Sequence, residues 1–436
     1  MKILLIQPTS YNINGRLIKK RKLYFAGLAF PILAALTPKE YEIELCYETI
    51  EDIPFDTDAD LIGIGSIGHA IVRTIELAEK YKKLGKTVIV GGYMASLMPN
   101  EVKPHCDSLI IGDAEEVWQD VLNDFAKGEL KGIYQKKLTS LNTPLPKYEL
   151  LLGKKIGNIM PVQAGRGCPN ACSFCSVFAL YKCQYFKRDI QDVMRDIKKL
   201  KELGFKKFIL LDDNIFSDRD YAFALCGEIR KLKMQWMTQC SIEIAYDPEL
   251  LDAVAKSGCM MLSFGLESIS KESLKHMNKA WAKPEQYSEQ LKIIRSFGME
   301  IATEMIIGGD GDTLESIRET AMFISNNNIA IPRFYILTPI PGTKLYEEMK
   351  QQGRLCSENI YHYNTYEAVH IPKNMTPEEL TQAYWDLYNE VYKWKNIMKR
   401  TLITKQVFKK PLTSIFCFFS NIYYRHQIKK GIVPNG

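Results

Sequence analysis

Two series of short apolar runs, each alternating with helix-like segments, constrain the fold of this chain more than any other feature. The runs of the first series are 2–7, 41–47, 60–66, 86–92 and 108–113. Residues 70–84 and 114–127, which lie between or after these runs, carry apolar residues at helical spacing. Near-continuous apolar strands alternating with helices predict a parallel sheet covered on both faces. Residues 1–130 are therefore predicted to form a Rossmann-like domain.

The second series predicts another α/β unit. Its strand candidates are 161–165, 207–212, 236–242, 260–267, 299–308 and 332–339. Helical segments are predicted at 188–203, 218–232, 247–257, 284–297 and 312–327. Six strand–helix repeats indicate a partial β/α barrel over 159–345. Residues 131–158, which contain Thr143-Pro-Leu-Pro146, are predicted to be a linker.

Residues 346–436 are predicted to be a helical extension. Asp247-Pro248 and Thr376-Pro377 are typical helix starts, with a capping side chain followed by proline at the first helical position. The second start opens a helix rich in Tyr and Trp that is expected to run towards Lys399. From Val391 onward the chain has ten Lys or Arg and no Asp or Glu, so the remainder carries 47 basic and 51 acidic residues. The positive net charge therefore belongs to the tail and does not predict nucleic-acid binding by the main fold.

Neither a membrane span nor a secretion signal is expected. The longest uncharged apolar stretches, 24–37 and 411–424, are shorter than the roughly twenty residues that span a bilayer. The first apolar run is ended by Pro8 and is interpreted as a buried strand. In the tail, aromatic residues alternate with lysines and arginines. This pattern is compatible with a helix packed on the barrel or with one lying on an anionic membrane surface.

Eleven cysteines are many for a cytoplasmic chain, and their odd number and irregular spacing do not suggest disulfides. Eight are scattered, as small core residues usually are. The other three, Cys168, Cys172 and Cys175, follow the first strand of the second series. Thiolates select zinc or iron–sulfur clusters, and structural zinc prefers four closed ligands. Three ligands on a four-iron cluster leave one iron free to bind something else.

The C-x3-C-x2-C spacing, with Phe174 before the last cysteine, resembles the radical S-adenosylmethionine (SAM) superfamily. The resemblance implies a 4Fe–4S cluster whose open iron binds SAM and whose electron cleaves it to methionine and a 5′-deoxyadenosyl radical. The residue-level alternative is a structural zinc loop or buried thiols.

Over about residues 1–380 the chain also resembles the cobalamin-binding radical SAM family, which includes hopanoid methylases and an anaerobic magnesium-porphyrin cyclase. The matching motifs occur in order along the chain: Gly91-Gly92 with Ser96 and Pro99, Gly112–Glu115 with Trp118, Leu211–Asn214, Gly265–Ser268, Gly308–Thr313 and Thr338–Thr343. The resemblance implies cobalamin at the carboxyl ends of the first sheet, near Ser66, Gly91 and Gly92. By the same resemblance, SAM is expected near Phe174, Asp212, Asn214, Ser241, Glu267 and Ile306. Helix capping is the alternative role for Asp212, Asp213 and Asp310.

The chain departs from the family pattern in places. Asp113 stands where Glu is frequent, Tyr93 stands where His is frequent, and the D-x-H-x-x-G motif of other cobalamin proteins is absent. His69 lies outside any such motif and is interpreted as an ordinary loop residue.

Three functions remain open from the sequence. The first is cobalamin-dependent methylation of an unactivated carbon, on a small-molecule or lipid substrate, with an external donor such as a flavodoxin or ferredoxin. The second is a radical SAM cyclisation, rearrangement or oxidation. The third is a non-enzymatic electron-transfer or sensor role. A methylthiotransferase is disfavoured because only Cys46 and Cys106 precede the linker. The expected location is cytoplasmic, with peripheral contact to the inner face of the membrane as one option.

Overall fold

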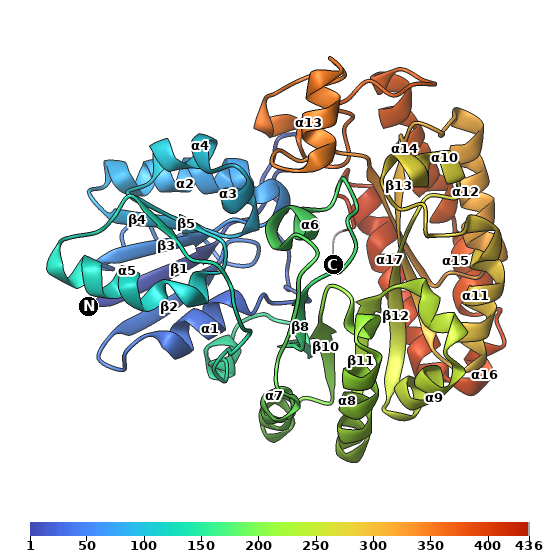
Figure 1. Ribbon diagram of the computed structural model, residues 1–436, viewed down its shortest axis with the longest axis horizontal. Helices are drawn as coiled ribbons and strands as arrows, with labels where there is room; N and C mark the ends of the chain where they lie inside the picture. Colours follow the sequence, from blue (N-terminus) through green and yellow to red (C-terminus); the bar gives the residue numbers. More distant parts are fainter. Residues whose placement is uncertain (435–436) are drawn as a thin grey trace. The chain divides into compact units, whose positions relative to one another are not determined.

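The computed structural model describes residues 1–434 (Figure 1). The chain divides into two compact units. The first consists of Met1–Gln163 with Phe186–Phe205, and the second consists of Ala164–Tyr185 with the described chain from Lys206 onward. Both units contain parallel sheets and helices, which agrees with the predicted α/β class.

The first unit contains a six-stranded parallel sheet in the order β2-β1-β3-β4-β5-β6. Its strands are β1 (Lys2–Gln7), β2 (Glu42–Tyr47), β3 (Leu61–Gly65), β4 (Thr87–Gly91), β5 (Ser108–Ile111) and β6 (Ile133–Gln135). The strand order reverses between β1 and β3, and such a switch point opens a crevice at the carboxyl ends of the strands. The predicted strands are thus confirmed to within one or two residues at each end.

Helices cover both faces of this sheet, with α2, α3 and α4 on one face and α1 and α5 on the other (Figure 1). The helices of the unit are α1 (Ala29–Leu36), α2 (Ile71–Lys83), α3 (Tyr93–Leu97), α4 (Pro99–Val102), α5 (Trp118–Lys127) and α7 (Ile190–Glu202). Strand β6 lies inside the segment that the sequence predicts to be a linker. With three residues it is too short to show an alternating pattern. It is stabilised by its pairing with β5, which the local sequence does not predict.

The second unit contains parallel strands in the order β14-β13-β12-β11-β10, each joined to its neighbour along the chain. These strands are β10 (Lys207–Leu211), β11 (Gln235–Cys240), β12 (Cys259–Glu267), β13 (Glu300–Ile307) and β14 (Ile331–Ile336). The strand expected before them is present as β7 (Ile159–Gln163), and the short strands β8 (Gly165–Gly167) and β9 (Tyr185–Lys187) flank the cysteine segment. Ala164, the residue after β7, donates its N–H to the carbonyl of Leu211 at the end of β10.

The helices of the second unit are α6 (Ser176–Tyr181), α8 (Arg219–Leu232), α9 (Pro248–Lys256), α10 (Lys271–His276), α11 (Pro284–Ser296), α12 (Leu314–Asn326) and α13 (Lys344–Gln351), followed by α14 (Pro377–Val391), α15 (Trp394–Thr401), α16 (Gln406–Lys409) and α17 (Pro411–Ile428). Five of them, α8, α9, α11, α12 and α14, begin within two residues of the predicted starts. Asp247 and Thr376 cap α9 and α14 as expected. The helix expected to run towards Lys399 instead ends at Val391, and α15 begins three residues later. Among the described residues no helix is long and apolar enough to cross a membrane.

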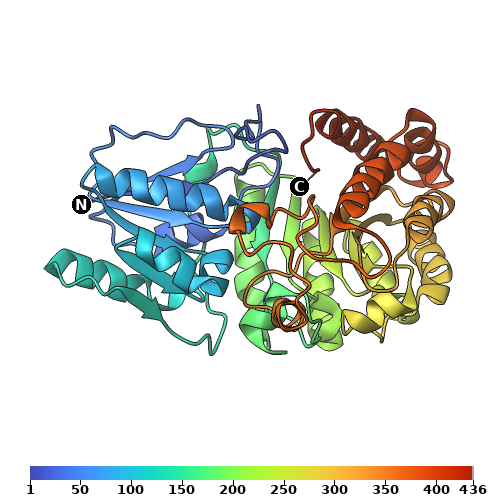
Figure 2. The ribbon, with the colours of Figure 1, turned by 90° about the horizontal axis from the view of Figure 1, so that it is seen from above.

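The C-terminal helices, red in Figure 2, lie against the second unit, where α14 and α17 contact β14 at the open edge of the sheet. The Tyr388 hydroxyl accepts from the N–H of Phe334 and donates to its carbonyl, at 2.9 and 3.1 Å. The Tyr392 hydroxyl donates to the carbonyl of Pro332. The Asn421 amide donates to the carbonyl of Ala330, at 2.8 Å. An edge strand normally presents such groups to solvent, where they can pair with another chain, so this extension completes the fold of the second unit.

Candidate cluster and cofactor sites

The three clustered cysteines lie on the loop between β8 and α6, and backbone contacts from distant segments fix this loop. Ser173 donates its N–H to the carbonyl of Met277, and its own carbonyl accepts from the N–H of Leu345, at 3.0 and 2.9 Å. The side-chain amide of Asn278 donates to the carbonyl of Ala171 at 2.6 Å. Two segments that lie more than a hundred residues downstream therefore hold the middle of the loop, which restricts the positions that the thiols can take.

The start of the loop is fixed by a glycine. Gly167 has φ +92°, and a Cβ added there would lie 2.1 Å from the carbonyl oxygen of Gln184. Only glycine fits this approach. Its N–H donates to the carboxylate of Asp213 at 2.6 Å. The close approach explains why glycine precedes Cys168.

The thiols of Cys168, Cys172 and Cys175 fit the cluster that the sequence predicts. Burial raises the pKa of all three thiols, of Cys172 to about 12, while the positive charge of Lys279 opposes the rise at Cys168 and Cys172. Bound iron would displace these protons, since thiolates are the metal-binding form. Among the described residues, no group of three His, Cys, Asp or Glu side chains is arranged to hold a single metal ion. A four-iron cluster makes a different demand, one thiolate on each of three separate irons, and three thiols on one loop fit it.

Two of the scattered cysteines differ from the expectation that they are core residues. Cys183 and Cys356 are exposed, whereas Cys46, Cys106, Cys226, Cys240, Cys259 and Cys417 are buried. Cys183 lies just beyond α6 and has φ +62°. It follows the cluster loop closely in sequence, so its thiol is a natural control for the three predicted ligands.

A buried ion pair lies beside the cysteine loop. Lys279 Nζ donates to Oε1 of Glu267 and to the carbonyl of Gly265, both at 2.7 Å. Burial alone would lower the pKa of Lys279, but the charges of Glu267, Cys172 and Cys175 raise it overall. Glu267 ends β12 at a bulge and has φ +60°, a costly conformation for a residue with a side chain. Glu267 was predicted from the sequence and Lys279 was missed, because nothing near it in the chain marks it.

Breaking this ion pair should destabilise the protein. We expect Glu267→Ala to lower the free energy of unfolding by about 3 kcal/mol, because it leaves the Lys279 ammonium buried without its carboxylate. Adding Lys279→Met should restore most of the loss, since both partners are then absent. Urea unfolding of the wild type, both single variants and the double variant measures the coupling. Additive effects of the two substitutions would mean that the pair is not coupled.

Three further predicted SAM residues form a connected chain at the ends of β10 and β11. The carboxylate of Asp212 accepts from the Tyr185 hydroxyl and from the N–H of Asn214, both at 2.8 Å. The Asn214 side chain in turn accepts from the N–H of Ser241 at 3.1 Å. Burial raises the pKa of Asp212 to about 7, although both hydrogen bonds oppose the rise. Carboxyl groups with a pKa raised by burial are typical of functional sites.

The raised pKa of Asp212 predicts a pH dependence of stability. Between about pH 4 and pH 7 the folded state holds a proton that the unfolded state has released, so stability falls as the pH rises through this window. Asp212→Asn should remove this fall and gain at most about 4 kcal/mol on the wild type between pH 4 and pH 8. Urea unfolding of both apo-proteins at the two pH values measures the difference. Parallel profiles would show that the carboxyl titrates normally.

Phe174 and Ile306, which are 132 positions apart in the chain, share one apolar neighbourhood. Both pack against one buried cluster of Met277, Leu337, Leu345 and Met349. An apolar wall of this kind can receive an adenine ring. The two residues therefore remain candidates for SAM contact.

The carboxylates proposed as alternative helix caps do not serve in that role. Asp218 caps α8, and Thr313 caps α12. Asp312 accepts from the N–H groups of Gly308 and Gly309, at 2.9 and 3.0 Å, and shapes the loop after β13. Asp310 instead pairs with Arg354 and Lys373 from the C-terminal extension, each at 2.7 Å. The capping interpretation of Asp212, Asp213 and Asp310 is therefore wrong.

The predicted cobalamin residues meet at the carboxyl ends of β3 and β4. Ser66 is buried, and its hydroxyl has no hydrogen-bond partner. Gly92 has φ +103°, and a Cβ there would lie 2.3 Å from the carbonyl oxygen of Ser66. An unpaired buried hydroxyl beside a backbone cradle that only glycine allows fits a bound ligand at this edge. Nearby, burial lowers the pKa of His69 to about 4, which keeps its imidazole neutral.

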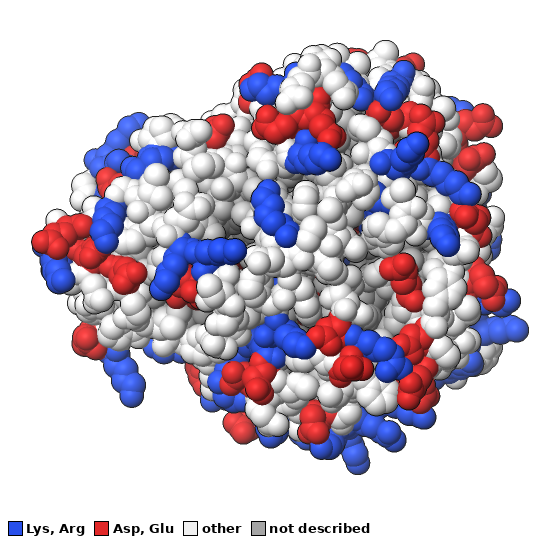
Figure 3. All heavy atoms as spheres, viewed as in Figure 1, with Lys and Arg blue, Asp and Glu red and all other residues white. Residues whose placement is uncertain are grey.

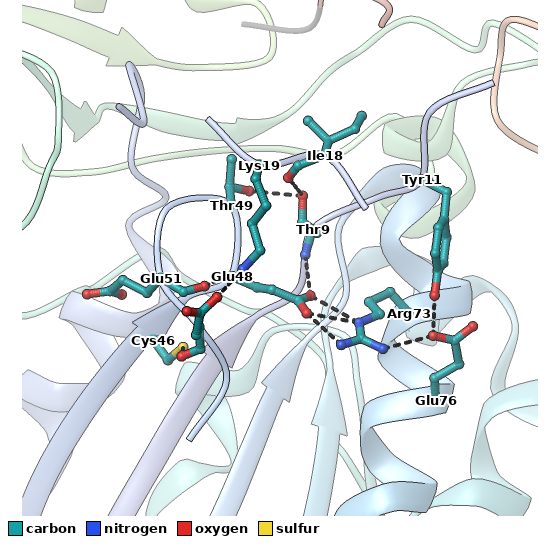
Figure 4. A network of polar contacts seen from close by, with 11 residues as sticks. Thr9, Tyr11, Ile18, Lys19, Cys46, Glu48, Thr49, Glu51, Arg73 and Glu76 are labelled. Carbon is teal, nitrogen blue, oxygen red and sulfur yellow. Dashed lines mark hydrogen bonds and ion pairs between the residues drawn. The ribbon is translucent and has the colours of Figure 1, made fainter. Parts of the chain in front are cut away.

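A polar network missed by the sequence reasoning stiffens the same edge of the first sheet (Figure 4). Glu48, the buried residue after β2, accepts from Nε and Nη2 of Arg73 on α2 and from the N–H of Thr9 after β1. Arg73 also pairs with Glu76 at 3.0 Å, whose carboxylate accepts from the Tyr11 hydroxyl. The loops after β1 and β2 are thereby held to α2 before any ligand binds.

Known families and curated relatives are similar to this chain in sequence. Residues 162–324 match the Radical SAM superfamily, and residues 343–414 match a domain of unknown function, DUF4070. The bacteriochlorophyllide d C-12(1)-methyltransferase of Chlorobaculum tepidum is 32% identical, over 85% of this chain and 83% of that protein. The C-8(2)-methyltransferase of the same organism is 30% identical, over 93% and 96%.

Solved structures show the same fold at low sequence identity. OxsB, a cobalamin-dependent SAM radical enzyme solved with aqua-cobalamin and SAM, gives a TM-score of 0.68 at 12% identity, over 98% of this chain and 72% of that one. TsrM from Kitasatospora setae, a radical SAM methyltransferase solved with tryptophan and a SAM analogue, gives 0.64 at 16% identity, over 80% and 76%.

Proposed function

This chain belongs to the radical SAM family, together with the bacteriochlorophyllide d methyltransferases, and we propose that it is a cobalamin-dependent methyltransferase acting on an unactivated carbon. The observation that carries the proposal is the loop of Cys168, Cys172 and Cys175, which distant backbone groups hold in place. The first unit adds a buried unpaired hydroxyl and a close glycine approach at its strand ends. The two bacteriochlorophyllide methyltransferases are 30 and 32% identical to this chain, whereas an anaerobic magnesium-protoporphyrin cyclase is 26% identical, which favours methyl transfer over cyclisation.

The residues of the second unit have separable roles in this proposal. The three thiolates hold the cluster, and Lys279 compensates part of their negative charge from a buried position. The proposal assigns Glu267 and Ser241 to the ribose of SAM, and Asp212 or Asn214 to its amino group. Phe174 and the backbone near Ile306 form the wall for its adenine. When bound, the cluster supplies the electron that cleaves SAM, and cobalamin carries the methyl group.

In the first unit, Ser66, Gly91 and Gly92 would support the corrin at the carboxyl edge of the sheet. The network of Glu48 and Arg73 keeps that edge in one arrangement, so little ordering is needed when the cofactor binds. The proposal includes a small-molecule or lipid substrate, an external one-electron donor of the flavodoxin or ferredoxin kind, and a cytoplasmic location with peripheral contact to the membrane through the C-terminal tail.

Anaerobic reconstitution with iron, sulfide and hydroxocobalamin tests the proposal. The protein should retain both groups in its absorbance spectrum, and it should form 5′-deoxyadenosine together with a methylated product when SAM, a reductant and a bacteriochlorophyllide are added. A protein that cleaves SAM but never retains corrinoid would favour a cyclisation, rearrangement or oxidation. A cluster whose spectrum SAM does not perturb would favour an electron-transfer role.

A further inference from the structure

In α16 and the first half of α17, polar side chains are buried and large apolar side chains are exposed. The face of α17 that packs on the protein carries Thr413, Ser414, Cys417 and Asn421, which are all buried. The outward face carries Leu412, Ile415 and Phe419, whose exposed fractions are 74%, 45% and 63%. Their spacing of three and four residues places them on one side of the helix. Phe408 on α16 is 90% exposed and Ile403 72% exposed.

The buried face of these helices has a definite partner within the second unit. The Ser414 hydroxyl donates to Glu300 at the first position of β13, at 3.4 Å, and Asn421 reaches the carbonyl of Ala330 just before β14. The Gln406 amide donates to the carbonyl of Arg295 at the end of α11. Helices α16 and α17 therefore lie at the amino ends of β13 and β14. The outward stripe, defined as Phe408, Leu412, Ile415 and Phe419, faces away from them.

The charged residues that flank the stripe along the chain are all basic. Lys405, Lys409 and Lys410 flank it along the chain, and no Asp or Glu occurs from Val391 onward. Lys207, the first residue of β10, lies over the Phe416 ring at 5.6 Å. The last turns of α8 and α9 also carry Arg230, Lys231 and Lys256, but Lys231 pairs with Glu228 and Lys256 with Asp252, each at 2.6 Å. In Figure 3 the surface over α8 and α9 accordingly shows Lys and Arg interspersed with Asp and Glu, so the lysines of the tail are the positive charge that the stripe has beside it.

We propose that the outward stripe of α16 and α17 inserts into the surface of an anionic lipid bilayer. Exposed apolar side chains flanked by lysines are typical of a helix that lies in a membrane interface. A second copy of the chain would bring like charge against like charge across a two-fold axis, which disfavours a dimer on this face. An anionic surface instead satisfies both the apolar residues and the lysines.

The position of the stripe fixes how the second unit meets the bilayer. The stripe lies at the amino ends of the strands, and the cysteine loop lies beside residues 276–278, beyond the carboxyl end of β12. The carboxyl ends thus point away from the lipid, so the substrate reaches the cluster from the aqueous side. This orientation rests on the proposed function, whereas bilayer binding does not.

Sedimentation with vesicles tests the binding. The full chain should bind vesicles that contain 30% phosphatidylglycerol in phosphatidylcholine and should bind pure phosphatidylcholine at least tenfold more weakly. Phe408→Ser with Phe419→Ser should weaken binding to the anionic vesicles by about tenfold or more. Met322→Ser, which removes an apolar side chain that is 58% exposed on α12, is the matched control and should bind as the wild type does.

Two outcomes would overturn the inference. Equal binding of the double variant and the wild type would exclude insertion of the stripe. Light scattering that shows a dimer, lost in the double variant, would make a second copy the occupant. Hydrogen exchange on anionic vesicles tests the orientation separately: amides in 406–420 should gain protection and those in 168–175 should not. Protection of the cysteine loop would contradict the orientation and leave vesicle binding and SAM cleavage as independent results.

Discussion

Serine at any one of Cys168, Cys172 or Cys175 will abolish the iron-dependent absorbance of the reconstituted protein and reduce SAM cleavage by more than about a hundredfold. Serine nearly conserves volume, so the buried loop keeps its backbone contacts to Met277 and Leu345. Its hydroxyl is a poor ligand for iron, which prefers soft thiolates. The loss of activity should exceed the roughly hundredfold loss that follows removal of a residue that only hydrogen-bonds to a metal ligand.

Cys183→Ser is the control for this experiment. Its thiol is exposed, it follows the same loop, and no role is assigned to it. We expect wild-type iron content and wild-type 5′-deoxyadenosine formation. Retention of iron and SAM cleavage in all three cluster variants, measured by iron analysis and chromatography, would remove the basis of the radical SAM assignment at these positions.

Alanine at Gly92 will separate the two halves of the proposed reaction. Its Cβ would lie 2.3 Å from the carbonyl oxygen and 2.9 Å from the nitrogen of Ser66, so the ends of β3 and β4 must move apart. The resulting protein should retain less than about a tenth of the wild-type corrinoid, because the cradle is filled and the Ser66 backbone displaced. Methylated product should fall in proportion. SAM cleavage, measured on the same sample, should remain close to the wild-type level.

Gly85→Ala is the matched control for Gly92→Ala. Gly85 precedes β4 in the same unit and has φ +75°, but a Cβ there would have no atom within 4 Å. It therefore imposes the left-handed strain without the steric clash. Normal corrinoid binding in the control and loss in Gly92→Ala would assign the effect to the cradle. Normal binding in both would mean that cobalamin lies elsewhere or is not bound.

Features set by neighbouring residues could be predicted from the sequence. The cysteine loop, the alternating strands and the starts of α9 and α14 all depend on residues within a few positions of one another. Lys279 could not be predicted, because its role arises from contacts with Glu267 and Gly265, which a turn and a helix separate from it. Strand β6 and the network of Glu48 and Arg73 were missed for the same reason: each depends on pairing across the unit.

The capping interpretation failed for a related physical reason. A carboxylate just after a strand can cap the next helix or enter the interior of the site, and local sequence does not distinguish these options. Asp212 is buried between Tyr185 and Asn214, while Asp310 is held by Arg354 and Lys373. The choice is made by residues from β9 and from the C-terminal extension, which only the folded chain brings near.

The tyrosine hydroxyls along β14 bear on how this protein can be shortened for study. A fragment that stops at residue 376 would retain the described strands and all three clustered cysteines. Phe334 would nevertheless lose Tyr388 on α14, and Pro332 would lose Tyr392 just after that helix. Exposed edge strands with unpaired backbone groups can pair between molecules. Such a fragment should therefore precipitate or form intermolecular sheets during expression. Soluble preparations should require everything up to the end of α17.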